Sequence, residues 1–289
     1  MKIFNLNKRM LGIVTGIALA TGLTSQASAA PVFTVDPSAI PGNVFATTPF
    51  NADFMSGITS ELLTITSPTT VTGTGWVQFT SYSLGGSTVP ALTSGLSGVD
   101  YGLYIKFSLA DTLVSGVMGA ANSLYNLTLL DFVMYADPGL NTTFTQANAP
   151  TITNATVGGT IADDIALASG NLITGVAGFN SLGGAYINAL NSFALCTGAG
   201  TANIGATPVA DANCANGTGL AYFSLPVPFY QLAFSEFNNT TQGILANGPY
   251  ISITQASGGV DYVPEPATLS LLGLGLLGIA ASLRNRKSA

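Results

Sequence analysis

The sequence predicts an all-β protein, an antiparallel β-sandwich-like single domain, on three observations. Short runs of alternating apolar and polar residues recur along the chain, clusters of Gly, Pro, Asn and Ser separate them, and helical periodicity is scarce. Tyr101–Ser108 shows the alternation most clearly, because every second residue from Tyr101 to Phe107 is large and apolar. Many short strands with frequent turns are typical of a β-sandwich.

The remaining segments follow from the same criteria. One or two helical turns are expected at Ile161–Ser169, with the acidic pair Asp163 and Asp164 near their start. Gly198–Gly219 has low complexity and is expected to form a long surface loop, and Gly258–Val263 to form a short linker. Further strands are expected at Leu62–Thr66, Trp76–Tyr82, Asn126–Tyr135, Leu220–Ser224, Gln231–Phe237 and Tyr250–Thr254.

The first residues have the order of a secretory signal peptide, predicted to cover residues 1–29. A basic start and an apolar stretch at Met10–Leu23 precede Ala27 and Ala29, the small residues that signal peptidase requires. Cleavage is predicted after Ala29, because a cut after Ala30 would place Pro31 at the first mature position. The all-β passenger domain is then predicted to cover residues 30–262.

Residues 263–289 combine three parts in a fixed order. Pro264, Glu265 and Pro266 cannot continue a helix and separate the folded domain from the apolar run behind them. That run, Ala267–Leu283, would span about 25 Å as a helix, close to the lower limit for crossing a bilayer. The basic residues at the tip favour the cytoplasmic side of a membrane. These residues are Arg284, Arg286 and Lys287.

This order resembles the PEP-CTERM sorting signal of Gram-negative bacteria. In that family an exosortase, a membrane transpeptidase-like protease, recognises the tail, and the passenger goes to the cell surface or extracellular matrix. The resemblance implies an exported protein that the Ala267–Leu283 helix anchors transiently in the inner membrane before processing near the Pro-Glu-Pro motif. An ordinary C-terminal membrane anchor is the alternative.

Composition excludes several classes of function. Residues 30–262 contain twelve acidic residues and one basic residue, Lys106, which leaves a net charge of −11. Binding to nucleic acid needs clustered Lys and Arg, which this segment lacks. The chain contains no histidine, so it lacks the usual general base and the commonest transition-metal ligand. No catalytic residue, metal ligand or cofactor is predicted, although carboxylates leave calcium open as an alternative.

Cys196 and Cys214 are the only cysteines. In an exported chain such a pair most simply forms a disulfide, here closing the low-complexity stretch between them. A thiolate metal site would need two further ligands, which the neighbouring sequence does not offer.

A few residues suggest other chemistry. Glu61 and Glu236, the passenger's only glutamates, could serve a two-carboxylate glycoside hydrolase, but nothing in the sequence brings them together. Asp163 and Asp164 are expected to be a solvated pair rather than a calcium site, since no D-x-D-x-D-G loop is present. Trp76 is expected to pack in a core rather than to stack on sugars.

Four short segments resemble the flocculation-associated PEP-CTERM proteins of floc-forming proteobacteria. The resemblance implies a non-enzymatic surface or matrix protein that supports flocculation and biofilm formation together with exopolysaccharide. A secreted carboxylate-dependent glycan hydrolase and a structural surface-layer component remain as alternatives. The expected partners are signal peptidase and exosortase during export, then exopolysaccharide or other matrix components, without nucleic acid. The four segments are Phe33–Pro37, Asn51–Gly57, Tyr101–Tyr104 and Tyr222–Tyr230.

Overall fold

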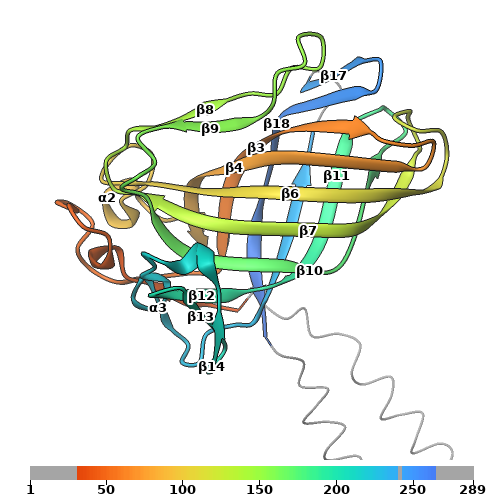
Figure 1. The fold of residues 1–289 in the computed structure, drawn as a ribbon. Helices are drawn as coiled ribbons and strands as arrows, with labels where there is room; N and C mark the ends of the chain where they lie inside the picture. The colour runs from red at the N-terminus through yellow and green to blue at the C-terminus, as the bar shows by residue number, and fades with distance from the viewer. Residues whose placement is uncertain (1–30, 240–242, 265–289) are drawn as a thin grey trace, which may run out of the picture.

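The computed structural model describes residues 31–239 and 243–264, which form an all-β protein, as predicted. Its main sheet closes on itself as an antiparallel barrel of eight strands (Figure 1). The barrel strands are β3 (Phe54–Ile65), β4 (Thr70–Leu84), β6 (Gly102–Ser115), β7 (Leu124–Asp137), β10 (Ile165–Phe179), β11 (Ala185–Ser192), β16 (Leu232–Asn238) and β18 (Tyr250–Val263). They pair in that order, and β18 pairs with β3 to complete the ring.

The closed barrel differs from the two packed sheets of the expected sandwich. β10 pairs with β7 on one side and with β11 on the other, so the sheet has no break at which two layers could separate. Inward-facing glycines make room for large neighbours: a Cβ at Gly75 would lie 2.5 Å from Phe107 Cζ, and one at Gly73 would lie 2.7 Å from Leu63 Cδ2. A register shift between Ala110 and Asp111 is typical of the bulges that bend barrel strands.

The other elements decorate this barrel. β15, β1 and β2 form a separate three-stranded sheet, β8 and β9 form a hairpin, and β12, β13 and β14 extend the main sheet from β10. The strands are β1 (Phe33–Val35), β2 (Phe50–Ala52), β5 (Ser87–Thr88), β8 (Thr142–Thr145), β9 (Thr156–Gly159), β12 (Ala194–Gly198), β13 (Thr201–Ile204), β14 (Thr207–Ala210), β15 (Phe223–Leu225) and β17 (Ile244–Asn247). The short helices are η1 (Pro37–Ala39), α2 (Ala91–Ser94), η2 (Ala212–Cys214) and α3 (Gly219–Tyr222).

Most of the expected strands lie inside longer ones, but four expectations were wrong. Ile161–Ser169 does not form a helix, because Ile165 begins β10. The first residues of β10 are buried on both faces of the sheet, so they lack the alternation that identifies a strand. Gly198–Gly219 is not one loop but contains β13, β14 and η2. Leu220–Ser224 is not all strand, because α3 extends to Tyr222. Gly258–Val263 is not a linker but the end of β18.

The glycines of that last segment serve packing. A Cβ at Gly259 would lie 2.3 Å from Phe54 Cζ, and one at Gly258 would lie 1.9 Å from the Glu236 carbonyl oxygen. Only glycine therefore allows β18 to approach β3 and β16 this closely. The glycines that suggested a flexible linker are instead required by the close packing of neighbouring strands in the barrel.

Trp76 packs in a core, as expected. It points outward from β4 and is buried beneath the β8–β9 hairpin, which lies across the outside of the barrel (Figure 1). Its indole N–H donates to the carbonyl oxygen of Thr145 at 2.9 Å, and its ring centroid lies 5.0 Å from that of Phe144. The indole is thus unavailable as a platform for sugar rings.

Candidate functional site

The predicted processing motif begins where the barrel ends. β18 extends to Val263, which pairs with Leu232 of β16, and the next residue, Pro264, is exposed. Immediately before them, the side chain of Tyr262 is fully buried, with its ring centroid 4.8 Å from that of Phe33. An exposed proline therefore directly follows a firmly anchored strand, without a linker between them.

The N-terminal end of the domain lies beside this junction. Phe33 begins β1, and the carbonyl oxygen of the preceding Val32 accepts a hydrogen bond from the Tyr230 hydroxyl at 3.0 Å. The Tyr230 ring is stacked on that of Tyr262, with centroids 5.9 Å apart. Because Phe33 also touches Tyr262, both ends of the folded domain emerge at the same end of the barrel.

Large aromatic side chains fill this end, and we call them the aromatic plug. Three of the plug's tyrosines are joined through their hydroxyls: Tyr222 Oη lies 2.6 Å from Tyr82 Oη and 2.7 Å from Tyr101 Oη, and Tyr101 donates to the Ser94 carbonyl oxygen at 2.8 Å. Burial raises the pKa of all three phenols, so they stay neutral. The plug consists of Phe33, Tyr82, Tyr101, Phe193, Tyr222, Phe223, Phe229 and Tyr262.

The cluster that contains the plug also includes residues from the four segments on which the sequence analysis based the expected resemblance to flocculation-associated proteins. Phe33, Met55, Tyr101 and Tyr222 come from the four segments, and all belong to one hydrophobic cluster. Their large side chains are buried at 1% exposure or less. These segments therefore build one end of the barrel together, and their aromatic residues have a structural role there.

The barrel interior holds a pair of carboxyls that the sequence analysis did not connect. Glu61 of β3 and Asp111 of β6 both point inward, are 7% and 5% exposed, and line an otherwise largely apolar cavity of about 90 Å³. Burial, with a contribution from the negative charge of Asp111, raises the pKa of Glu61 to about 8. Burial alone raises the pKa of Asp111 to about 7.

Further polar groups line the same cavity. The side-chain amide of Asn191 donates to Ser235 Oγ at 3.3 Å, whereas Asn191 Oδ1 and Asp111 Oδ1 are buried without a hydrogen-bond partner among the described residues.

The alternation of the sequence contained a signal for Asp111. This residue continues the series of inward-facing positions that includes Ile105, Phe107 and Leu109. An acidic residue at a position where the alternation predicts a buried side chain is uncommon, so Asp111 could have been singled out from the sequence.

The structure separates the two glutamates considered for hydrolysis. Glu61 faces the barrel interior, whereas Glu236 is exposed on the outer face of β16 and accepts a hydrogen bond from Asn238 Nδ2 at 3.1 Å. The barrel wall therefore lies between the two carboxyls. Lys106 is exposed on the outside, with its Nζ 5.9 Å from the Tyr135 ring centroid.

Asp163 and Asp164 are not a solvated pair at a helix start, since they directly precede β10. Asp163 is exposed and accepts from Asn141 Nδ2 at 3.1 Å, but Asp164 is buried and accepts hydrogen bonds from Tyr104 and Thr142. Burial raises the pKa of Asp164 despite these bonds. Within the described parts of the chain, no group of three or more His, Cys, Asp or Glu side chains is arranged to hold a metal ion.

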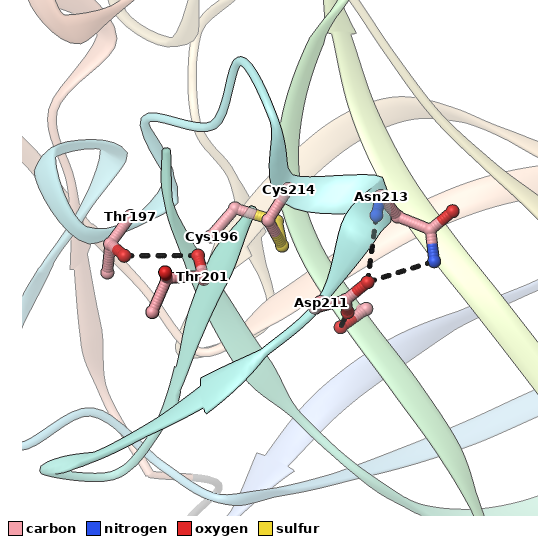
Figure 2. Close-up of a disulfide and its surroundings, with 7 residues drawn as sticks. Cys196, Thr197, Thr201, Asp211, Asn213 and Cys214 are labelled. Carbon is pink, nitrogen blue, oxygen red and sulfur yellow. Dashed lines mark hydrogen bonds between the residues drawn. A yellow bond between two sulfur atoms is a disulfide. The ribbon is translucent and has the colours of Figure 1, made fainter. Parts of the chain in front are cut away.

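Cys196 and Cys214 form the predicted disulfide, with their Cα atoms 5.0 Å apart. The bond joins β12 to η2, as Figure 2 shows. Asp211 caps η2: its Oδ1 accepts from the backbone N–H and side-chain amide of Asn213 at 2.9 and 3.0 Å. The disulfide thus fixes a packed hairpin, rather than a loop, against the barrel.

Several predicted residues lie outside the described part of the chain. They are the signal peptide with Ala27 and Ala29, the motif residues Glu265 and Pro266, the apolar run Ala267–Leu283, and the basic residues Arg284, Arg286 and Lys287. Within residues 31–239 and 243–264, no helix has the length and apolar character needed to span a membrane.

Comparison with known families identifies the C-terminal segment. The family model for the PEP-CTERM protein-sorting motif matches residues 263–287, beginning at the last residue of β18. Neither the curated proteins nor the solved structures include a match to the chain.

Proposed function

We propose that this chain, which carries a PEP-CTERM protein-sorting motif, delivers its barrel to the cell surface and extracellular matrix, where it supports cell aggregation together with exopolysaccharide. The motif makes the protein an exported substrate of exosortase. Flocculation and biofilm formation are the finer part of the proposal. It assigns the barrel an adhesive rather than an enzymatic role.

One observation carries the proposal, namely the position of the motif. The match begins at Val263, the last residue that β18 pairs into the sheet, and Pro264 is already exposed. Cleavage at or after the motif would leave every barrel strand intact. Tyr262, through its packing in the aromatic plug, would keep the new C-terminus folded. The barrel is thus suited to release as a complete domain.

The same geometry gives the precursor an orientation. Three residues, Pro264 to Pro266, separate β18 from the apolar run that begins at Ala267. At about 3.5 Å per residue, this connection reaches roughly 10 to 14 Å. The end that carries the aromatic plug would therefore face the membrane while the protein is anchored, with the opposite end directed away.

The outer barrel face offers neutral hydrogen-bonding groups for a polysaccharide. Thr74 of β4 pairs with Ser108 of β6, and Thr112 of β6 pairs with Asn126 of β7. Thr74 and Asn126 are exposed, and Ser108 and Thr112 are partly exposed. Uncharged hydroxyl and amide groups on a rigid sheet can form hydrogen bonds with sugar hydroxyls.

The alternatives predict different behaviour. A glycan hydrolase built on Glu61 and Glu236 loses its premise, since the barrel wall separates these two carboxyls. A structural surface-layer component would share the export route, but its loss would alter the cell envelope rather than aggregation alone.

Deletion of the gene tests the adhesive role. Cells without the protein should fail to flocculate while exopolysaccharide output stays normal, and wild-type protein should restore flocs. A variant with Pro264, Glu265 and Pro266 all changed to Ala should remain with the cells and fail to restore them. Pro68→Ala, in the exposed β3–β4 turn, is the matched control and should restore flocs fully. Normal flocculation by the deletion strain would reject the adhesive function.

A further inference from the structure

The barrel interior has features of a ligand site that the adhesive role does not use. Its cavity of about 90 Å³ is lined mainly by Leu, Ile, Val, Phe and Ala side chains. Against this background, Glu61, Asp111 and Asn191 are each more than nine-tenths buried. Asp111 Oδ1 and Asn191 Oδ1 lack hydrogen-bond partners among the described residues. An apolar cavity with a few convergent polar groups is the usual form of a small-molecule site.

The described part of the chain has no cation to place against these carboxyls. Lys106 is its only lysine or arginine, and that side chain is exposed on the outer face of β6. Buried carboxyls without a partner cost stability, and apolar residues of similar size would remove that cost. A purely structural role therefore accounts poorly for two acids in one apolar cavity.

We infer that the barrel interior binds a small aliphatic amine, with its ammonium group at Glu61 and Asp111 and its hydrocarbon part against the apolar wall. The hydrocarbon would lie against residues such as Leu109, Ile253 and Phe179, which line the same cavity. An engineered apolar cavity of about 150 Å³ takes up benzene, which has six non-hydrogen atoms, so about 90 Å³ suits a smaller molecule of about four or five.

In this proposal the ligand enters at the end of the barrel opposite the aromatic plug, which the loop between β6 and β7 covers. There the loop between β6 and β7 folds inward: Met118 packs on the apolar cluster at this end, and the Gly119 N–H donates to the Tyr125 hydroxyl at 2.7 Å. Val117 of the same loop is 69% exposed. The plugged end, by contrast, is filled by fully buried aromatic side chains.

Charge pairing gives the site a specific pH dependence. The titratable groups that line the cavity are Glu61 of β3, Asp111 of β6, Tyr125 of β7 and Tyr186 of β11; β4, β10, β16 and β18 contribute none. Without ligand, Glu61 and Asp111 hold protons near neutral pH, because their pKa values are raised to about 8 and about 7. An entering ammonium ion replaces such a proton, which is released to solvent. Affinity should therefore rise at least tenfold between pH 5.5 and pH 8.5.

Calorimetric titration with n-butylamine, to about 10 mM because so few atoms limit the affinity, tests the site. The sample is the exported protein as cells release it, and butan-1-ol and butyrate are the comparison ligands. We expect one saturable site for butylamine, weaker binding of butanol and none of butyrate. Repeating the titration in buffers of different ionisation enthalpy should show proton release.

Variants separate the inference from a folding defect. Glu61→Gln and Asp111→Asn keep the side-chain shape and should each weaken butylamine binding at least tenfold. The exposed Glu236→Gln should bind as wild type, and thermal unfolding should show that all three proteins are folded. Absence of saturable binding would mean a cavity that holds water only and would overturn the inference. So would unchanged binding in both cavity variants, or butyrate binding as tightly as butylamine.

Discussion

Tyr222 and Tyr101 bring their hydroxyl oxygens within 2.7 Å of each other, although 121 residues separate them in the chain. Tyr101 donates to Ser94, so Tyr222 donates to Tyr101 and accepts from Tyr82. This ordered series of hydroxyls joins the segment before β6, the C-terminal half of the chain and β4. It explains how a barrel end built from distant segments is held in one arrangement.

Removing the central hydroxyl should destabilise the fold. Tyr222→Phe leaves the buried Tyr82 hydroxyl without its partner, which costs about 1 to 3 kcal/mol in the free energy of unfolding. Urea denaturation followed by circular dichroism measures this loss. Tyr250→Phe, on a partly exposed tyrosine outside the plug, is the control and should change stability little. Equal effects of the two substitutions would contradict a role for the hydroxyl series.

Stability should fall as pH rises through the neutral range. The pKa of Glu61 is raised from 4.5 to about 8 and that of Asp111 from 3.8 to about 7. The unfolded chain therefore loses these protons first, so the free energy of unfolding decreases between about pH 4 and pH 8. Both carboxyls are neutral in both states below this range, where the penalty disappears.

Glu61→Gln should remove much of this dependence. We expect it to stabilise the protein by about 2 kcal/mol or more at pH 8 and to change little at pH 4. Thermal unfolding at the two pH values, with Glu236→Gln as the exposed control, gives the comparison. An equal stability change at pH 4 and pH 8 would show that Glu61 carries no buried charge penalty.

The disulfide should contribute to stability through the unfolded state. Cys196 and Cys214 are 18 residues apart in sequence, and closing a loop of this size contributes about 3 kcal/mol. The double Cys→Ser variant should lose about that much in denaturant unfolding. Alkylation of the native protein without reduction should label neither thiol. Quantitative labelling would rule out the bond in the exported protein.

Aggregation should depend on divalent cations. Five of the passenger's twelve acids are buried, so the repelling surface charge is smaller than the sequence alone indicated. Carboxylates such as Asp131, Asp163 and Glu236 remain exposed, and calcium can bridge them to acidic polysaccharide at close approach. Chelation with EDTA should weaken wild-type flocs, and added calcium should restore them. Flocs that persist in EDTA but need the gene would exclude cation bridging.

Local pattern predicted much of the fold. The two-residue period that begins at Tyr101 continues through β6, which starts at Gly102, and Trp76–Tyr82 lies within β4. Ring closure was not predictable in this way, because it depends on β10 pairing with both β7 and β11. β10 was missed because its first residues, Ile165 to Gly170, are buried on both faces and show no alternation.

The candidate sites also differ in how far the sequence predicted them. The export signal could be predicted from the sequence because the residues of the sorting motif are contiguous, from Val263 to Lys287. The interior carboxyls were not predicted, since Glu61 and Asp111 are 50 residues apart in sequence and line one cavity only because β3, β4 and β6 lie side by side in the barrel. Each acid could have been assigned to the inward-facing positions of its own strand. Placing both acids in one cavity requires the order in which the strands pair.

The central claim is that exosortase processing at the motif releases the intact barrel, and mass spectrometry of the protein recovered from the matrix tests it most directly. Peptides should cover the barrel through Tyr262 and end near Pro264–Pro266, without any peptide from Leu269–Ala289. The variant with Pro264, Glu265 and Pro266 changed to Ala should instead stay cell-associated and keep its tail. Recovery of the intact tail on most of the wild-type molecules in the matrix would contradict the account.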